Sequence, residues 1–113
     1  MKKIEAIIQP DALVSVKEAL FDADIHKMTV HRVKGCGQQK GYQESYRGKI
    51  YHVNLHEKVK IEIAVNDGFV QAAIDAIIKG ARTGTIGDGK IFVTSLEQCV
   101  RIRTGEEGQE AIG

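Results

Sequence analysis

The segment Gly84–Lys90, with the sequence GTIGDGK, has the residue types of an anion-binding loop. Glycines let successive backbone N–H groups point into one concavity, and Lys90 adds a cation beside them. The segment fits the phosphate-loop pattern G-x-x-x-x-G-K, but Ile91 stands where that pattern then requires Ser or Thr. A helical pattern precedes the loop and a strand pattern follows it, which is the reverse of a nucleotide-triphosphatase loop. Two interpretations remain: a phosphate cradle of another kind, or an ordinary helix-to-strand turn.

Two pairs of cations are spaced so that each pair could bind one anion. Arg101 and Arg103 are separated by one residue in a segment that we expect to be extended, so both side chains would point the same way. Lys58 and Lys60 have the same spacing in an expected strand. Paired arginines can bind a polyphosphate bidentately, which isolated lysines do less well. The alternative is a solvated basic edge that prevents strands of different molecules from pairing.

The segment 34–41, KGCGQQKG, is a weaker candidate. It nearly matches the dinucleotide pattern G-x-G-x-x-G, but Lys40 occupies the third glycine position and no helical pattern follows. Gln38, Gln39 and Lys40 could instead hold a carboxylate or a magnesium-bound anion, or could simply form a polar loop mouth. No nucleophile–base pair stands out, so the sequence does not favour an enzyme. The histidines also lack metal-ligand spacing; they are His26, His31, His52 and His56.

The composition is that of one soluble globular domain, since 113 residues are too few to close two cores. Sixteen basic residues nearly balance fifteen acidic ones, which gives no overall field that would attract nucleic acid or a membrane surface. We find no membrane-spanning apolar run and no signal-peptide pattern, so direct membrane insertion is not expected. Cys36 and Cys99 lack a C-x-x-C arrangement, which favours two reduced thiols in a cytoplasmic protein.

The hydrophobic pattern predicts two strand–helix–strand units. In the first, residues 2–9 and 28–33 have strand patterns, and Asp11 would cap the helix between them. Residues 35–57 show no periodicity and are interpreted as a long loop. The second unit has strands at 58–66 and 90–96, with a helix between them that Asn66 or Asp67 would cap. The residues expected to face the core from the helices are Leu13, Val16, Ala19, Leu20 and Ala23, then Val70, Ala73, Ile74, Ile77 and Ile78.

This order predicts an α+β fold of the ferredoxin-like type, βαββαβ, with both helices on one face of an antiparallel sheet. The other face would be solvated or buried against further subunits. The strands carry more apolar residues than we expect for one face, so we predict that self-association buries the second face. The residues behind this expectation are Ala6, Ile8, Ile61, Ile63 and Phe92.

Six segments together resemble the PII nitrogen regulatory family of signal-transduction proteins, GlnB/GlnK type. They are KKIEAIIQP, RVKGCGQQKG, ESYRGKIY, KVKIEI, ARTGTIGDGKIFV and VRIRTGEEG, and the resemblance covers essentially the whole chain without gaps. It implies a single PII-type domain, residues 1–113, assembled as a homotrimer whose sheets line a central channel. Family members bind ATP or ADP competitively in clefts between subunits, and bind 2-oxoglutarate with Mg-ATP. The resemblance therefore implies a sensor of nitrogen, carbon and energy status.

The resemblance also implies which residues contact the nucleotide. The phosphate loop corresponds to the family's B-loop, about residues 82–90, and the two arginines lie in its C-terminal loop, about 101–109. Gly37 and Gln38 fall at the base of the long loop, although many members have arginine at the position of Gln38. The implied nucleotide-binding set is Thr29, Gly37, Gln38, Glu62, Ala64, Gly87, Asp88, Gly89, Lys90, Arg101 and Arg103.

A second group of residues matches the family's 2-oxoglutarate site. Lys58 corresponds to the lysine that pairs with the 2-oxoglutarate carboxylate, and backbone N–H groups at Lys40 and Gly41 help to hold it. The side-chain oxygen of Gln39 corresponds to a ligand of the ATP-bound Mg²⁺. Cys36 replaces a common phenylalanine beneath this site.

The long loop, about residues 37–53, corresponds to the T-loop, the arm through which family members dock into partners. Bound ligands would shift the population of its conformations, and that shift would be the signal. The implied partners are an ammonium transporter or a nitrogen-assimilation enzyme or regulator, with peripheral membrane association only through a transporter. Tyr51 matches a tyrosine that some branches uridylylate; Tyr42 and Tyr46 are the other tyrosines of the loop, and Lys49 replaces a serine that another branch phosphorylates.

Two alternatives remain open at this point. One is a small enzyme that hydrolyses ATP slowly, with Gln39 and Lys40 near the γ-phosphate, although no carboxylate is placed to orient water. The other is a sensor of ATP and ADP alone, to which the changes at Gln38 and Cys36 could point.

Overall fold

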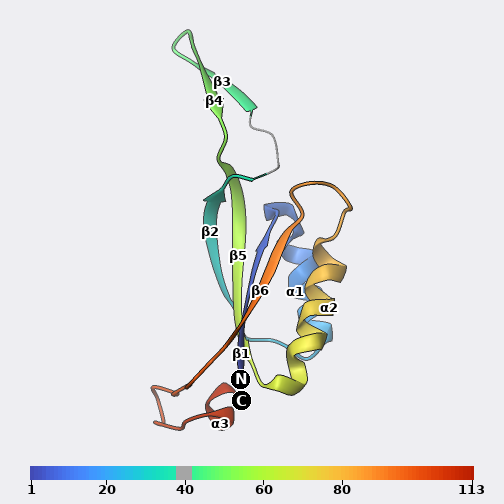
Figure 1. Cartoon of the computed structure of the whole chain (residues 1–113), viewed down its shortest axis with the longest axis vertical. Coiled ribbons are helices and arrows are strands. Elements are labelled where there is room, and N and C mark those ends of the chain that lie inside the picture. The colour runs from blue at the N-terminus through green and yellow to red at the C-terminus, as the bar shows by residue number, and fades with distance from the viewer. Residues whose placement is uncertain (38–41) are drawn as a thin grey trace.

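The computed structural model describes residues 1–37 and 42–113 and contains a four-stranded antiparallel sheet (Figure 1). The strand order is β2-β5-β1-β6, in which β1 and β5 are central. This is the predicted ferredoxin-like arrangement, because each strand–helix–strand unit leaves a gap that a strand of the other unit fills. The bounds are β1 Lys2–Ile8, β2 Thr29–Gly35, β5 His56–Val65 and β6 Gly89–Ser95.

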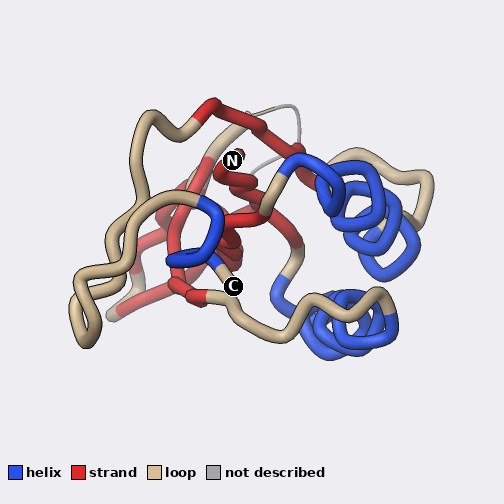
Figure 2. Tube along the Cα trace, turned by 90° about the horizontal axis from the view of Figure 1, so that it is seen from below, coloured by secondary structure: helices blue, strands red, loops and turns tan. Residues whose placement is uncertain are grey.

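Both long helices cover the same face of this sheet (Figures 1 and 2). Helix α1 spans Leu13–Asp22 and helix α2 spans Val70–Ala81, and a short α3, Gln109–Ile112, lies near the end of the chain. A 3-10 turn precedes each long helix, and neither turn has a side-chain cap. Asn66 occupies the N-cap position of the turn that leads into α2, whereas the prediction that Asp11 caps the first helix is wrong. Asp11 lies inside the first turn, and Asp67 instead accepts a hydrogen bond from the Met1 ammonium group at 2.8 Å.

The core lies between the helices and the sheet. The predicted helix stripes are confirmed in outline, since Val16, Leu20, Ala73 and Ile77 are at most 1% exposed. Helices α1 and α2 approach closely at Gly80, where an added Cβ would lie 2.6 Å from the Val16 Cα. The sheet side of the core consists of Ile4, Ala6, Ile8, Val59, Ile61, Ile63 and Val65.

The prediction of a second apolar sheet face is wrong. Ala6 and Ile61 are paired across β1 and β5 and are both buried under the helices, as are Ile8 and Ile63. The face of the sheet opposite the helices is called the open face here. Of the apolar residues on which that prediction relied, only Phe92 lies on this face, because it pairs with Glu5. The strand period of two sends the charged residues of β1 and β5 to that face instead. Lys3, Glu5, Lys60 and Glu62 form a network of ion pairs there, and His31 Nε2 lies 3.8 Å from Glu62 Oε2.

The segment predicted to be a long loop contains a hairpin. Strands β3, Tyr42–Tyr46, and β4, Lys49–Val53, pair antiparallel and project from one end of the molecule (Figure 1). The turn residues Arg47 and Gly48 both have positive φ, +51° and +78°, which is the backbone of a tight two-residue hairpin turn. The hairpin was missed because a single glycine and mixed polar residues give a weak strand pattern.

The C-terminal segment is not extended, contrary to expectation. Val100 and Glu107 form an isolated bridge, and the N–H of Gly105 donates to the Arg101 carbonyl oxygen at 2.7 Å, so the chain reverses between them. Gly105 and Gly108 have φ of +73° and +72°, conformations that glycine adopts without steric cost. Among the described residues, no helix has both the length and the apolar character needed to cross a bilayer.

Candidate functional site

The loop between α2 and β6 is organised by one carboxylate. Asp88 Oδ2 accepts the backbone N–H of Thr83 at 2.7 Å and that of Gly84 at 2.8 Å, and its Oδ1 accepts the Thr83 hydroxyl. The hydroxyl, followed by these N–H groups, holds the pKa of Asp88 below its ordinary value. The Asp88 carboxylate therefore fixes the loop itself, whereas the phosphates of a ligand would have to be held by N–H groups and cations.

Glycine at two positions of this loop is required by the path of the chain. Gly89 has a φ of +109°, and an added Cβ would lie 1.7 Å from the carbonyl oxygen of Ile7. Gly87 has a φ of +106°. The loop therefore has a structural reason for these glycines whether or not it binds phosphate.

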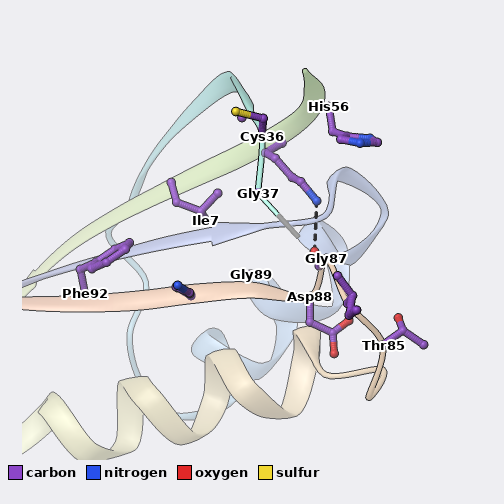
Figure 3. Close-up of a pocket in the computed structure, with 13 residues that line it drawn as sticks. Ile7, Cys36, Gly37, His56, Thr85, Gly87, Asp88, Gly89 and Phe92 are labelled. Carbon is purple, nitrogen blue, oxygen red and sulfur yellow. Dashed lines mark hydrogen bonds between the residues drawn. The ribbon is translucent and has the colours of Figure 1, made fainter. Parts of the chain in front are cut away.

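A cavity of about 740 Å³ adjoins this loop (Figure 3). Its volume is within the range of small-molecule sites, roughly 300–1,000 Å³. The cavity lies between segments that are distant in sequence: the end of β1, the end of β2, the start of β5, and the loop before β6 with the start of that strand. It brings together Gly37, Lys58, Gly87, Asp88, Gly89 and Lys90 of the predicted sites, with Ile7, Gly35, Cys36, His56, Thr85, Ile86 and Phe92 as further lining residues.

Ile7 and Phe92 were missed as lining residues, although the strand register could have identified both. Ile7 pairs with Lys90, and Phe92 follows on the same open face of β6. His56 lines the cavity because it begins β5, two residues before Lys58.

Lys58 connects the predicted 2-oxoglutarate site to the loop that is predicted to contact the nucleotide. Its side chain is only 9% exposed although it lies on the open face, and its Nζ donates to the Gly87 carbonyl oxygen at 3.1 Å. Figure 3 draws this contact as the dashed line that ends at Gly87. The ammonium group, which the resemblance predicts to contact a carboxylate ligand, is therefore held against the loop between α2 and β6, residues 82–88. This loop is called the glycine loop below.

Arg101 and Arg103 are not brought to this cavity. Strand β6 begins at the cavity and carries the chain to the opposite end of the molecule, where the C-terminal turn lies (Figure 1). Its seven residues span about 23 Å at roughly 3.3 Å per residue. The prediction that both arginines point the same way from a strand is also wrong, because residues 102–104 form a turn. Within one chain, Arg101 and Arg103 are therefore far from the glycine loop.

The arginines also differ in their surroundings. Arg101 forms an ion pair with Glu106, with 3.0 Å between Nη1 and Oε1, and its Nη2 donates to the carbonyl oxygens of Glu110 and Ala111. Arg103 is exposed and forms no ion pair with any described residue. Ile102 between them is 100% exposed.

The residues predicted on the adenine and ribose side lie together, away from the cavity. Thr29 pairs with Glu62 across β2 and β5, and Ala64 is two residues further along β5. The pKa of Glu62 is lowered, first by a hydrogen bond with the Glu5 carboxyl and further by the charges of Lys60 and Lys3. The side chain of Glu62 is therefore already engaged in the charged network of the open face.

Several predicted residues lie outside the described ranges. They are Gln38, Gln39, Lys40 and Gly41. The backbone of Tyr51 is described and pairs with Glu44 in the hairpin.

The described residues fit a phosphate ligand better than a metal held by the protein. Lys58 and Lys90 are cations, and Asp88 is the only described carboxylate that lines the cavity. Because its oxygens already accept the hydrogen bonds of Thr83 and Gly84, it is poorly suited to bind Mg²⁺. Among residues 1–37 and 42–113, no group of three or more His, Cys, Asp or Glu side chains is arranged to hold a metal.

Comparison with known proteins gives consistent matches over nearly the whole chain. A family model described as nitrogen regulatory protein P-II matches residues 1–106. A nitrogen regulatory protein P-II from Azospirillum brasilense is 57% identical over 112 residues, which cover 99% of this chain and 100% of the relative. One from Bradyrhizobium diazoefficiens is 56% identical with the same coverage. A nitrogen regulatory protein P-II 2 from Methanothermobacter thermautotrophicus is 53% identical over 99% of this chain and 97% of its own length.

Proposed function

The chain belongs to the P-II nitrogen regulatory protein family, and we propose that it is a homotrimeric sensor of ATP, ADP and 2-oxoglutarate. The sensor would act on target proteins through the β3–β4 hairpin. The proposal is supported chiefly by the distribution of the cations. Lys58 and Lys90 are at the cavity, whereas the C-terminal segment that contains Arg101 and Arg103 lies at the other end of the same chain (Figure 1).

This separation favours a site shared between subunits. A polyphosphate held by the glycine loop would meet the arginines only if they came from a neighbouring copy of the chain. Closed rings of identical subunits provide such head-to-tail contacts, in which one end of each subunit faces the other end of the next. The two described parts would then be the two halves of one nucleotide site.

The chemistry of the proposed site follows from its charges. Lys90 and the N–H groups of residues 87–90 would contact the phosphates, and the neighbour's Arg101 and Arg103 would neutralise them. Thr29, Glu62 and Ala64, which lie away from the cavity, would contact the adenine and ribose from the subunit that supplies the arginines. Mg²⁺ would be held mainly by phosphate oxygens, with Gln39 as a protein ligand.

Lys58 gives the proposed 2-oxoglutarate response a physical basis. A carboxylate is a stronger acceptor for an ammonium group than a neutral carbonyl, so 2-oxoglutarate would compete with Gly87 for Lys58. The same exchange would alter the contact between the base of the hairpin segment and the glycine loop. Lys40 and Gly41 would complete the carboxylate site, and Gln38 would adjoin the nucleotide with Gly37.

The proposed output is a change in how the hairpin is presented to partners. Its tip exposes Tyr46 and Ile50, at 60% and 67%, next to the Arg47–Gly48 turn. An exposed tip with apolar and cationic groups can dock into a protein surface. The proposed targets are an ammonium transporter or an enzyme or regulator of nitrogen assimilation in the cytoplasm. Uridylylation of Tyr51 would be a further control.

Slow ATP hydrolysis is less well supported than sensing. A hydrolase needs a group that orients the attacking water, and Asp88 is the only described carboxylate at the cavity. Its hydrogen bonds to the loop and its lowered pKa make it a poor base. A sensor of ATP and ADP without a 2-oxoglutarate response would rest on the changes at Gln38 and Cys36, of which Cys36 lines the cavity.

Calorimetric titration of the purified chain with Mg-ATP, with and without 2-oxoglutarate, tests this function. We expect Mg-ATP and ADP to compete for one class of site, and we expect 2-oxoglutarate to bind only when Mg-ATP is present. Sedimentation analysis of the same sample should give the mass of three chains. Absence of ATP binding would exclude the proposal, whereas ATP binding that ignores 2-oxoglutarate would reduce it to an ATP and ADP sensor.

A further inference from the structure

The guanidinium group of Arg101 contacts several oxygen atoms of the C-terminal segment. Its Nη1 is 3.0 Å from Glu106 Oε1, and its Nη2 donates to the carbonyl oxygens of Glu110 at 2.9 Å and Ala111 at 3.4 Å. Arg101 thus joins Glu106 of the turn to the short helix α3. Both terminal nitrogens of the guanidinium group therefore already donate to protein oxygens.

The backbone keeps Glu106 beside Arg101. The N–H of Arg101 donates to the Glu106 carbonyl oxygen at 2.9 Å, and that of Gly105 donates to the Arg101 carbonyl oxygen at 2.7 Å. These bonds close the turn without any side chain, so the carboxylate of Glu106 stays within reach of the guanidinium. Both side chains of the ion pair are partly exposed, 29% for Arg101 and 39% for Glu106, and a ligand could therefore approach them.

Glu106 reduces the electrostatic attraction between Arg101 and an anionic ligand. An arginine paired with a carboxylate attracts a phosphate less than an unpaired one, because the carboxylate repels the same anion. Arg103, two residues away, has no ion pair among the described residues and keeps its full charge. The two arginines are therefore unequal partners for a polyphosphate.

We propose that Glu106 sets the affinity of the nucleotide site by competing with the ligand's phosphates for Arg101. This inference rests on the proposed function, since it requires that Arg101 meet a nucleotide bound at a neighbouring copy. The carboxylate of Glu106 positions the guanidinium in the absence of ligand and weakens phosphate binding when ligand is present. Its removal without loss of shape should strengthen binding.

The substitution Glu106→Gln separates charge from shape. Glutamine has the same length and its side-chain oxygen can still accept the hydrogen bond from Arg101 Nη1, while the two backbone hydrogen bonds of the turn are unaffected. Glu107→Gln is the matched control, because it removes the same charge from the adjacent, exposed residue. Glu107 forms no ion pair within the described part of the chain.

The test is the dissociation constant of Mg-ATP, measured by calorimetry on the wild type and both variants. We expect Glu106→Gln to bind Mg-ATP about two- to fivefold more tightly, which is the effect of one partly exposed ion pair. Glu107→Gln should change the constant much less. Affinity for adenosine, which has no phosphate, should be the same in all three proteins.

The outcomes separate this inference from the proposed function. If the wild type does not bind Mg-ATP, the proposed function fails and the inference fails with it. If the wild type binds but Glu106→Gln binds Mg-ATP no more tightly, the inference alone is overturned. A parallel change in ATP and adenosine affinity would also overturn it, because Glu106 would then act only on the structure.

Discussion

Lys58 Nζ and the carbonyl oxygen of Gly87 lie 3.1 Å apart and join the start of β5 to the loop that precedes β6. The two residues are 29 positions apart in sequence and belong to different parts of the proposed ligand site. Since Lys58 is 9% exposed, the contact is shielded from water and should hold the loop firmly.

The first prediction follows from this contact. Lys58→Met keeps an unbranched side chain of similar length but removes the charged donor, so the 2-oxoglutarate carboxylate loses its cation. We expect at least a tenfold loss of 2-oxoglutarate affinity, given that a hydrogen bond to a charged group contributes about 1.5–3 kcal/mol. Titration of 2-oxoglutarate in the presence of saturating Mg-ATP measures this loss. Lys60→Met, on the same face of β5, is the control and should retain the response.

Gly89 and Gly84 provide a matched pair for the second prediction. An added Cβ at Gly89 would lie 1.7 Å from the Ile7 carbonyl oxygen, so the start of β6 must move away from β1. At Gly84, with a φ of +87°, a Cβ would meet nothing within 4 Å and would add only backbone strain. We expect Gly84→Ala to cost about 1–2 kcal/mol and Gly89→Ala clearly more, measured by urea unfolding. Equal losses would mean that the contact with Ile7 is unimportant.

The third prediction concerns acid sensitivity. The folded chain lowers the pKa of Asp88, so its contribution to stability is complete well above about pH 4, the ordinary aspartate value. The contribution disappears as the pH falls through the lowered pKa of the folded state. Asp88→Asn should therefore be less stable than the wild type at pH 7, with a difference that shrinks as the pH falls below about 4. Thermal unfolding at a series of pH values measures this, and a constant difference would contradict it.

Patterns that depend on neighbouring residues along the chain were predictable from the sequence. The stripe that includes Ala73 and Ile77 has the helical period, and both residues are buried. Alternation in β5 likewise separated Val59, Ile61 and the other apolar residues from the charged ones. These features required no knowledge of the tertiary structure, because amphipathic periodicity reflects the side of each element that meets the core.

The errors arose where the outcome depends on pairing between segments. Ala6 and Ile61 looked like an excess of apolar residues until the register showed that they share one buried face. The orientation of Arg101 depends on Glu106 and on carbonyl oxygens of α3, contacts formed across a reversal that two positive-φ glycines permit. The cavity combines Lys58 with the glycine loop, and no local pattern links segments so far apart.

The final prediction tests whether the site is shared between subunits. Lys90→Ala removes a cation from the cavity, and Arg103→Ala removes one from the C-terminal turn at the opposite end of the chain. Each variant alone should bind ATP weakly, because every site in its trimer lacks one cation. Neither residue lies in the helix–sheet core, so both variants should fold and assemble like the wild type.

Mixed trimers of these two variants should regain binding. If each site takes Lys90 from one subunit and Arg103 from the next, every ring that contains both variants has a site with both cations intact. Random exchange in an equal mixture should then restore about a quarter of the sites, following the cyclic symmetry of the ring. Denaturing and refolding the two variants together, followed by ATP titration, gives this fraction. If both cations came from the same subunit, mixing would restore no sites, because each chain would still lack one of the two.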